Sequence, residues 1–146
     1  MIDGKKVEDF DFHVQPNPKA VIEEQALSVA GVTREQVLAY PSMGEVYKQL
    51  VAILGKYVGK FNKKDKFFLV GYNNAAFDNQ FLRGFFLQNG DNYFGSWFWA
   101  NSIDVMVLAS HHLASRRHEM ENFKLATVAK FMGINVDDAA LHDAFY

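Results

Sequence analysis

Asp78 is the residue whose type and position first suggest chemistry. It lies in the stretch GYNNAAFDNQFL (71–82), between Phe77 and Phe81, shortly after the apolar run FFLVGY (67–72). Such a run is typical of a strand that helices bury on both faces. In open α/β sheets, ligand sites form at the carboxyl ends of the strands. A carboxylate in that place suits a bound divalent cation, which prefers oxygen ligands.

A structural account of the same residues is also open. Asn73 or Asn74 could cap the following helix, and an acid in its first turn is stabilised by the helix dipole by roughly 0.3–1 kcal/mol. Phe77, Phe81 and Phe85 recur every four residues, which predicts that they pack in the core. On this account, the aspartate only stabilises the helix.

The elements expected around these residues alternate between strands and helices, which indicates an α/β or α+β fold. Strands are expected at 5–14, at 67–72 and just before Asp104. Helices are expected at 18–31, at 33–40 and at 43–61. Three more are expected: one that contains Asp78 and ends at about residue 89, one that begins at about residue 104, and one at 122–134. Thr33 and Gln36 have the spacing of a capping box at one of these helix starts.

The N-terminal segment 5–14 alternates apolar and polar residues, as a half-buried antiparallel strand does. Asp3-Gly4 directly before it is a strong hairpin-turn signal. A hairpin needs a strand on both sides, so we expect a partner strand upstream of Met1.

Composition limits the class of protein. With 146 residues, 49% hydrophobic and 15% aromatic, the chain can bury one sizeable core, and we expect a single domain over 1–146. Because 15 Lys+Arg face 17 Asp+Glu, a nucleic acid would have to be held locally rather than by a strongly basic surface. The absence of cysteine excludes disulfides and thiolate metal sites. No signal-peptide pattern or apolar span is found, so a cytoplasmic protein is expected.

Other residues that could do chemistry are interpreted structurally. Three histidines are expected to be solvated: His111, His112 and His118. Arg116 and Arg117 could contact phosphate, although an exposed pair of charges is the simpler account. The aromatic cluster from Trp97 to Trp99 could stack on a base, but core packing is favoured.

Two motifs resemble those of a known family. GYNNAAFDNQFL resembles the second motif of the DnaQ-like 3′–5′ exonucleases of the DEDD superfamily, in which a strand ending in His/Tyr-Asn-Ala leads to Phe-Asp-x-x-Phe-Leu on a helix. HDAFY (142–146) resembles the third motif of the His-containing DEDDh branch. SIDVMVLA (102–109) and NFKLATVAKFMGI (122–134) are similar to the segments between them. The chain thus resembles a DNA polymerase III epsilon-subunit-like exonuclease domain along essentially its whole length.

The resemblance implies an α/β, ribonuclease-H-like fold with a mixed sheet flanked by helices. It also implies two divalent metal ions, Mg²⁺ or Mn²⁺, held by four carboxylates. Asp78 matches the metal ligand of the second motif, and His142 matches the histidine that acts as general base. Asn74 and Phe77 match substrate-binding positions, and Asp104 matches an acid beside the site.

This chemistry suits a phosphodiester. The attacking water must become hydroxide-like at neutral pH, and negative charge on phosphorus and on the leaving 3′ oxygen must be neutralised. Two metal ions about 3.5–4 Å apart can do both. A histidine with a pKa near 6.5 can accept the proton of the water.

The chain also departs from the family pattern. The first motif of the family, Asp-x-Glu, lies on a strand that would precede Met1, and the final aspartate of the third motif would be residue 147. Only one of four metal-holding carboxylates is then present. We therefore expect an internal fragment of an exonuclease domain that lacks its first strand and the end of its last helix, and that is inactive or nearly so.

Three functional hypotheses follow. The leading one is a 3′–5′ exonuclease that releases nucleoside monophosphates from single-stranded DNA or RNA ends. The alternative is a non-catalytic module with a degenerate DnaQ-like fold that binds nucleic acid or protein. An Asp-x-Glu strand upstream and an aspartate after Tyr146 would favour the enzyme. A weaker idea is a homodimer formed by strand exchange, and a polymerase partner is a further possibility.

Overall fold

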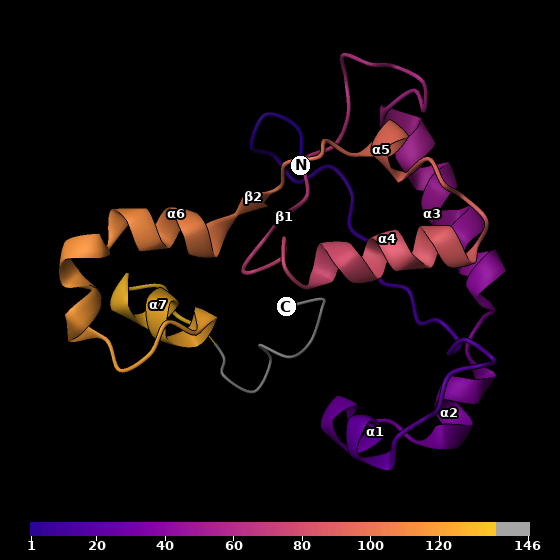
Figure 1. Ribbon diagram of the computed structural model, residues 1–146, viewed down its shortest axis with the longest axis horizontal. Coiled ribbons are helices and arrows are strands. Elements are labelled where there is room, and N and C mark those ends of the chain that lie inside the picture. Colours follow the sequence, from indigo (N-terminus) through magenta and orange to yellow (C-terminus); the bar gives the residue numbers. More distant parts are fainter. Residues whose placement is uncertain (137–146) are drawn as a thin grey trace.

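The computed structural model describes residues 1–136 of the chain. Figure 1 shows short strands at the centre, with α3, α4 and α5 on one side and α6 and α7 on the other. The elements in chain order are α1 (Glu24–Ala30), α2 (Arg34–Ala39), α3 (Met43–Tyr57), β1 (Val70–Gly71), α4 (Asp78–Gln88), α5 (Phe94–Trp97), β2 (Ile103–Asp104), α6 (Val105–His112), the 3-10 helix η1 (Ala114–Glu119) and α7 (Leu125–Phe131). None of the helices in this part of the chain combines the length and apolarity needed to cross a bilayer.

β1 and β2 form a parallel pair in which Val70 lies opposite Ile103 and Gly71 opposite Asp104. An isolated parallel bridge between Phe67 and Phe98 extends the pairing toward the start of the strands. The register brings the carboxyl ends of both strands to one edge. The prediction of a strand buried on both faces is wrong, because Val70 is 63% exposed. Within residues 1–136 this sheet has two strands only, and Ile103, the partner of Val70, is also exposed, at 40%.

Several helix ends follow from local chemistry. The predicted capping box of α2 is confirmed, since the Thr33 hydroxyl accepts from the Gln36 backbone N–H and the Gln36 side chain accepts from the Thr33 N–H. α3 begins with a second box of the same kind between Ser42 and Glu45. α1 ends at Gly31, whose φ of 66° is the left-handed conformation that glycine adopts without strain.

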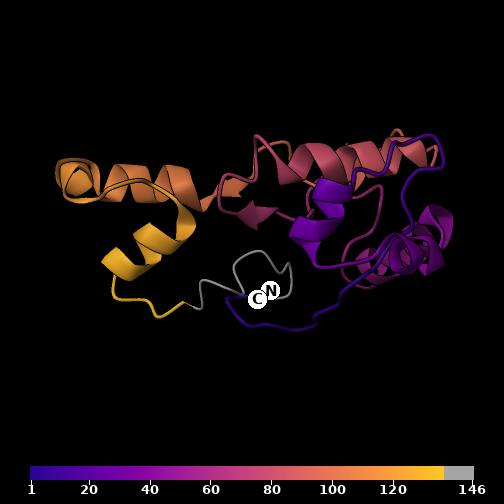
Figure 2. The ribbon, with the colours of Figure 1, turned by 90° about the horizontal axis from the view of Figure 1, so that it is seen from below.

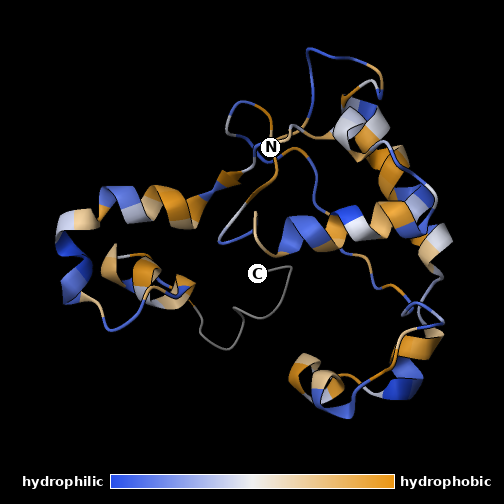
Figure 3. Cartoon of the chain, in the orientation of Figure 1, coloured by the Kyte–Doolittle hydropathy of each residue, from blue (hydrophilic) through white to orange (hydrophobic). Residues whose placement is uncertain are grey.

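Two small cores hold the helices. Leu54, Phe86, Trp97 and Phe98 bury their side chains where α3, α4 and α5 meet. A second cluster, formed by Ala109, Leu113 and Val128, joins α6 to α7. Figure 2 shows the α6–α7 unit at the opposite end of the molecule from α3. In Figure 3 the apolar residues of α3 and α4 lie near one another, and those at the start of α6 lie on the other side of the strands, consistent with two clusters.

The predicted N-terminal strand at 5–14 is not formed. Asp3 and Gly4 make the predicted tight turn, with φ of 48° and 75°, but its ladder is a single antiparallel bridge between Ile2 and Lys5. A strand needs a partner, and none pairs with this segment among the described residues. Glu8 instead ties the segment to α3, through bonds of 2.7 Å from Lys56 and from Tyr57.

Candidate active site

The candidate active site is built on the edge where β1 and β2 end. After β1 the chain turns sharply, and Asn73 has a φ of 60°, a left-handed conformation that asparagine tolerates better than most residues. Asp104, at the end of β2, accepts the Asn73 backbone N–H through Oδ1 at 2.9 Å. The same oxygen accepts the Met106 N–H at 2.9 Å and so caps α6. One carboxylate therefore fixes both strand ends.

Asn74 lies inside this turn rather than at its surface. Its side chain is buried, and its amide nitrogen donates to Oδ1 of Asn79 at 3.3 Å. Gly71 makes room for it, because a Cβ at that position would lie 2.8 Å from the Asn74 Cβ. Oδ1 of Asn74 is buried without a partner among residues 1–136. This placement suits holding the turn, and its predicted contact with substrate stays a prediction.

Asp78 is the first residue of α4 and is exposed, so its carboxylate is accessible to a ligand and favoured by the helix dipole. Neither Asn73 nor Asn74 caps α4 with its side chain. The helix begins at the N-cap residue Phe77, and the backbone carbonyl of Asn74 accepts the N–H groups of Phe77 and Asn79. The structural alternative for this turn, a side-chain cap, is therefore wrong.

Phe77 and Phe81 form an exposed aromatic pair beside Asp78. Their ring centroids are 4.9 Å apart, and the two residues are 59% and 67% exposed. The prediction that both pack in the core is wrong, because α4 turns Phe86 and partly Phe85 toward α3 and α5 instead.

Tyr72 links the end of β1 to the second helical unit. Its hydroxyl donates to the backbone carbonyl of Phe123 at 2.6 Å. Burial raises the pKa of the Tyr72 phenol above its usual value; Arg117 opposes this rise and Asp104 adds to it. Tyr72 therefore stays neutral at physiological pH and anchors the strand end to the segment before α7.

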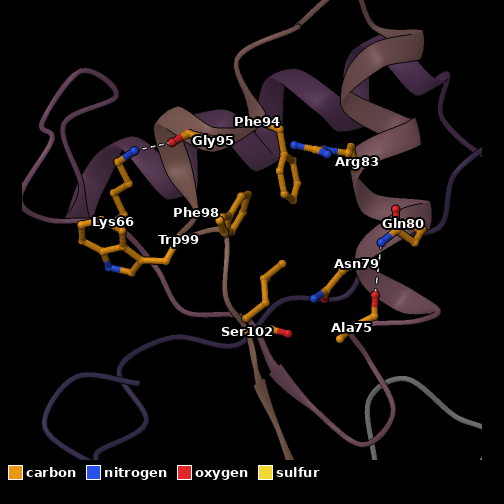
Figure 4. Close-up of a pocket in the computed structure, with 12 residues that line it drawn as sticks. Lys66, Ala75, Asn79, Gln80, Arg83, Phe94, Gly95, Phe98, Trp99 and Ser102 are labelled. Atoms are coloured by element: carbon orange, nitrogen blue, oxygen red, sulfur yellow. Dashed lines mark hydrogen bonds between the residues drawn. The ribbon is translucent and has the colours of Figure 1, made fainter.

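A cavity of about 360 Å³ lies beside this edge, between the start of α4 and the segment that leads into β2 (Figure 4). Lys66 and Arg83 contribute its positive charge. Neither residue was predicted to belong to a site, because they are 17 positions apart and belong to no motif. Asn79 and Arg83 are four residues apart, so they lie on one face of α4 and both line the cavity. This spacing was the only sequence feature that could have indicated a polar face there.

A family model described as RNase_H superfamily matches residues 10–144. The chain belongs to the RNase_H superfamily. No curated protein matches it significantly in sequence. The match and the parallel β1–β2 pair confirm the predicted α/β, ribonuclease-H-like fold.

Solved structures of exonuclease I share the fold of this RNase_H superfamily chain. Exonuclease I of E. coli, in complex with a dT13 oligonucleotide, matches with a TM-score of 0.61 and 20% identity over 86% of this chain and 28% of its own. A structure of exonuclease I described as suggesting how processivity is achieved gives a TM-score of 0.62 and 21% identity over 85% and 27%. A product-bound exonuclease I gives 0.61 and 21% over 88% and 31%.

This RNase_H superfamily chain spans less than a third of the exonuclease I chains that it matches. The predicted resemblance to a DnaQ-like exonuclease domain is confirmed for superfamily and fold. Three finer points stay predictions: that the chain belongs to the DEDDh branch, that it resembles the epsilon subunit of DNA polymerase III, and that the protein is cytoplasmic. The comparisons lend no support to a homodimer or a polymerase partner.

The described residues do not by themselves fit a two-metal centre. Within 1–136, no group of three His, Cys, Asp or Glu side chains is placed to hold a metal ion. Asp78 offers one accessible carboxylate, and the carboxylate of Asp104 is engaged with two backbone N–H groups. His142, the predicted general base, lies outside the described residues.

The other polar and aromatic residues lie as the sequence indicates. Three histidines are exposed: His111, His112 and His118. Arg116 pairs with Glu119 at 2.9 Å, and the Arg117 guanidinium carbon lies 3.6 Å from the centroid of the Phe123 ring. Trp97 is buried in the core as predicted, whereas Trp99 is half-buried and lines the cavity.

Proposed function

We propose that this chain is part of a metal-dependent 3′–5′ exonuclease domain that hydrolyses phosphodiester bonds at single-stranded 3′ ends of DNA or RNA. One observation carries the proposal: in a chain of the RNase_H superfamily, the turn that presents Asp78 is bonded through Asn73 to Asp104 on the neighbouring strand. The end of β2 and the turn that leads to Asp78 therefore lie together at the edge where α/β proteins bind ligands.

Two divalent ions and a histidine general base, His142, belong to this proposal. The described residues supply Asp78 as one metal ligand, so the remaining carboxylates must come from parts of the protein outside 1–136. Asp104 positions the turn and does not bind metal. The same proposal includes the prediction that residues 1–146 are an internal part of a single exonuclease domain.

The exposed pair Phe77 and Phe81 supports a nucleic-acid substrate. Two aromatic rings 4.9 Å apart, beside an accessible carboxylate, offer an apolar surface for a terminal base. Base–aromatic stacking contributes about 1–3 kcal/mol per base and tolerates any sequence. Contact with Phe77 would place the terminal nucleotide next to Asp78. Exonuclease I, which shares the fold, has been solved with a dT13 oligonucleotide, and this agrees with a single-stranded substrate.

A non-catalytic module that binds nucleic acid or protein is the second candidate. It is favoured by the lack of a group of three metal-capable side chains within 1–136. This module would keep the aromatic pair and the turn but would never cut a strand.

Cleavage of 5′-labelled single-stranded DNA and RNA tests the proposal. A longer version of the protein, encoded by the same open reading frame with its neighbouring segments, is incubated with manganese or with EDTA. Stepwise shortening from the 3′ end with manganese, and none with EDTA, is the expected result. Binding without any shortening would contradict the exonuclease and favour the module.

A further inference from the structure

The cavity beside the candidate active site has the size and lining of a ligand site that the proposed chemistry does not use. Its volume of about 360 Å³ lies within the range of about 300–1,000 Å³ that is usual for ligand pockets. Asn79, Gln80 and Arg83 line it from α4, while Trp99 and Ser102 line it from the segment before β2. Asp78 is not among its lining residues.

The cavity is positively charged in a protein that carries more acids than bases. Lys66 and Arg83 line it, and no carboxylate does, whereas the chain as a whole has a net charge of −2. Neither cation forms an ion pair within residues 1–136. Lys66 donates to the backbone carbonyl of Gly95, which leaves its charge uncompensated. An anion is therefore the ligand that this lining favours.

Aromatic rings accompany both cations. The Lys66 ammonium lies 5.4 Å from the centroid of the Trp99 ring, and the Arg83 guanidinium carbon lies 5.5 Å from that of Phe94. Figure 4 shows the two cations on opposite sides of the cavity, with Phe94 and Phe98 between them. Cations spaced along a floor of aromatic rings are the pattern by which proteins hold single-stranded nucleic acid.

The cavity continues toward the strand-end edge. A neighbouring hollow of about 480 Å³ is lined by Asp104. Ala75, Ala100 and Ser102 line both spaces, so the two adjoin. Asn79, which lines the cavity, directly follows Asp78 in α4. A strand whose end lies at Asp78 would therefore have this cavity within its reach.

We propose that the cavity binds a nucleotide unit of single-stranded nucleic acid, in which Lys66 and Arg83 contact successive phosphates and the half-buried ring of Phe94 contacts the base between them. The proposal rests on the proposed function, because it assigns the cavity to the same strand. It adds a binding site that holds the strand away from the reacting end. Asn79 and Ser102 supply neutral hydrogen-bonding groups at the side that adjoins the Asp104 hollow.

Binding measured without metal tests this site separately from cleavage. Fluorescence anisotropy of 5′-labelled oligo(dT) is followed in EDTA for the wild-type chain and for Lys66→Gln, Arg83→Gln and the double variant. Lys64→Gln is the matched control, because it removes the same charge two residues from Lys66 but lines no part of the cavity. Circular dichroism and thermal melting establish that each variant is folded.

Each cavity variant should bind the oligonucleotide at least five-fold more weakly than the wild type. The slope of log K against log salt should fall by about 0.7 for each phosphate that the variant no longer neutralises, and by about twice that in the double variant. Lys64→Gln should keep both values. Thymidine monophosphate is titrated in parallel. If Arg83→Gln also weakens the monophosphate, the cavity takes a free nucleotide; if only the oligonucleotide is affected, it takes a strand. Either result supports the site.

Unchanged affinity and salt slope in the double variant would overturn the proposal, as would an equal loss in Lys64→Gln or no binding by the wild type. These outcomes differ from failure of the proposed function. A protein that binds strands through Lys66 and Arg83, yet never shortens them with manganese in its longer version, would contradict the exonuclease alone.

Discussion

Asp104 offers the sharpest test of the geometry at the strand-end edge. One of its carboxylate oxygens accepts the backbone N–H groups of Asn73 and Met106, each at 2.9 Å. Asp104→Ala removes both interactions. Loss of an N-cap costs about 1 kcal/mol, and the bond to the exposed Asn73 contributes about 1 kcal/mol more. The free energy of unfolding should therefore fall by about 2 kcal/mol.

Asp104→Asn is the matched control, because asparagine keeps the side-chain oxygen and caps helices about as well as aspartate. Urea unfolding, followed by tryptophan fluorescence, measures both variants. With a slope of about 2 kcal/mol per M, the alanine midpoint should fall by about 1 M. The asparagine midpoint should fall by no more than about a quarter of that. Equal losses in the two variants would show that the charge of Asp104, rather than its acceptor oxygen, stabilises the edge and would refute this reasoning.

Further predictions concern packing and pH. Gly71→Ala should lower the free energy of unfolding by about 1–3 kcal/mol because of the clash with Asn74; in the same urea assay Gly95→Ala, where a Cβ meets nothing within 4 Å, should cost less. Burial raises the pKa of Asp91. Hydrogen bonds from the Lys60 ammonium and from the Tyr47 hydroxyl lower it by more, so the pKa of Asp91 lies below its usual value. The stability contributed by Asp91 is therefore present above about pH 4 and lost as the pH falls through its lower folded pKa, and urea midpoints at acid pH should show this loss in the wild type but not in Asp91→Asn. Burial and the Asp91 carboxylate raise the pKa of Tyr47 to about 12. The stability that the neutral Tyr47 phenol contributes should therefore be lost as the pH rises from about 10 through that value, and phenolate absorbance follows the ionisation.

Local sequence signals predicted the local structure well. The capping box at Thr33 and Gln36, the Asp3-Gly4 turn and the presence of a helix around Asp78 all depend on neighbouring residues, and all are present. The N-terminal strand depends on a partner distant in the chain, and alternation of apolar residues cannot show whether that partner is there. Its absence within 1–136 leaves this segment unpaired.

The aromatic stripe of α4 shows the limit of helical spacing. Residues four apart share a face only approximately, and Phe77 is an N-cap residue outside the helix. Phe77 and Phe81 therefore lie on the surface, whereas Phe86, outside the predicted stripe, is fully buried. Spacing identifies a face but not the element that covers it.

The same limit applies to the site. The motif placed Asp78 at a strand end and Asp104 at a helix start. In the structure Asp104 is the N-cap of α6, whereas Asp78 is the first residue of α4, beyond the turn that follows β1. The hydrogen bond that joins their turns connects residues 31 positions apart and has no linear signal. The cavity formed by Lys66 and Arg83 also required the folded chain.

Cleavage by active-site variants tests the central claim most directly. In the longer version of the protein, Asp78→Asn, His142→Ala and the control Asp65→Asn, which removes an exposed loop acid, are assayed on 5′-labelled single strands with manganese. We expect Asp78→Asn to abolish shortening, His142→Ala to slow it by about 10²–10⁴-fold, and Asp65→Asn to leave it unchanged. Undiminished cleavage by Asp78→Asn would contradict the account.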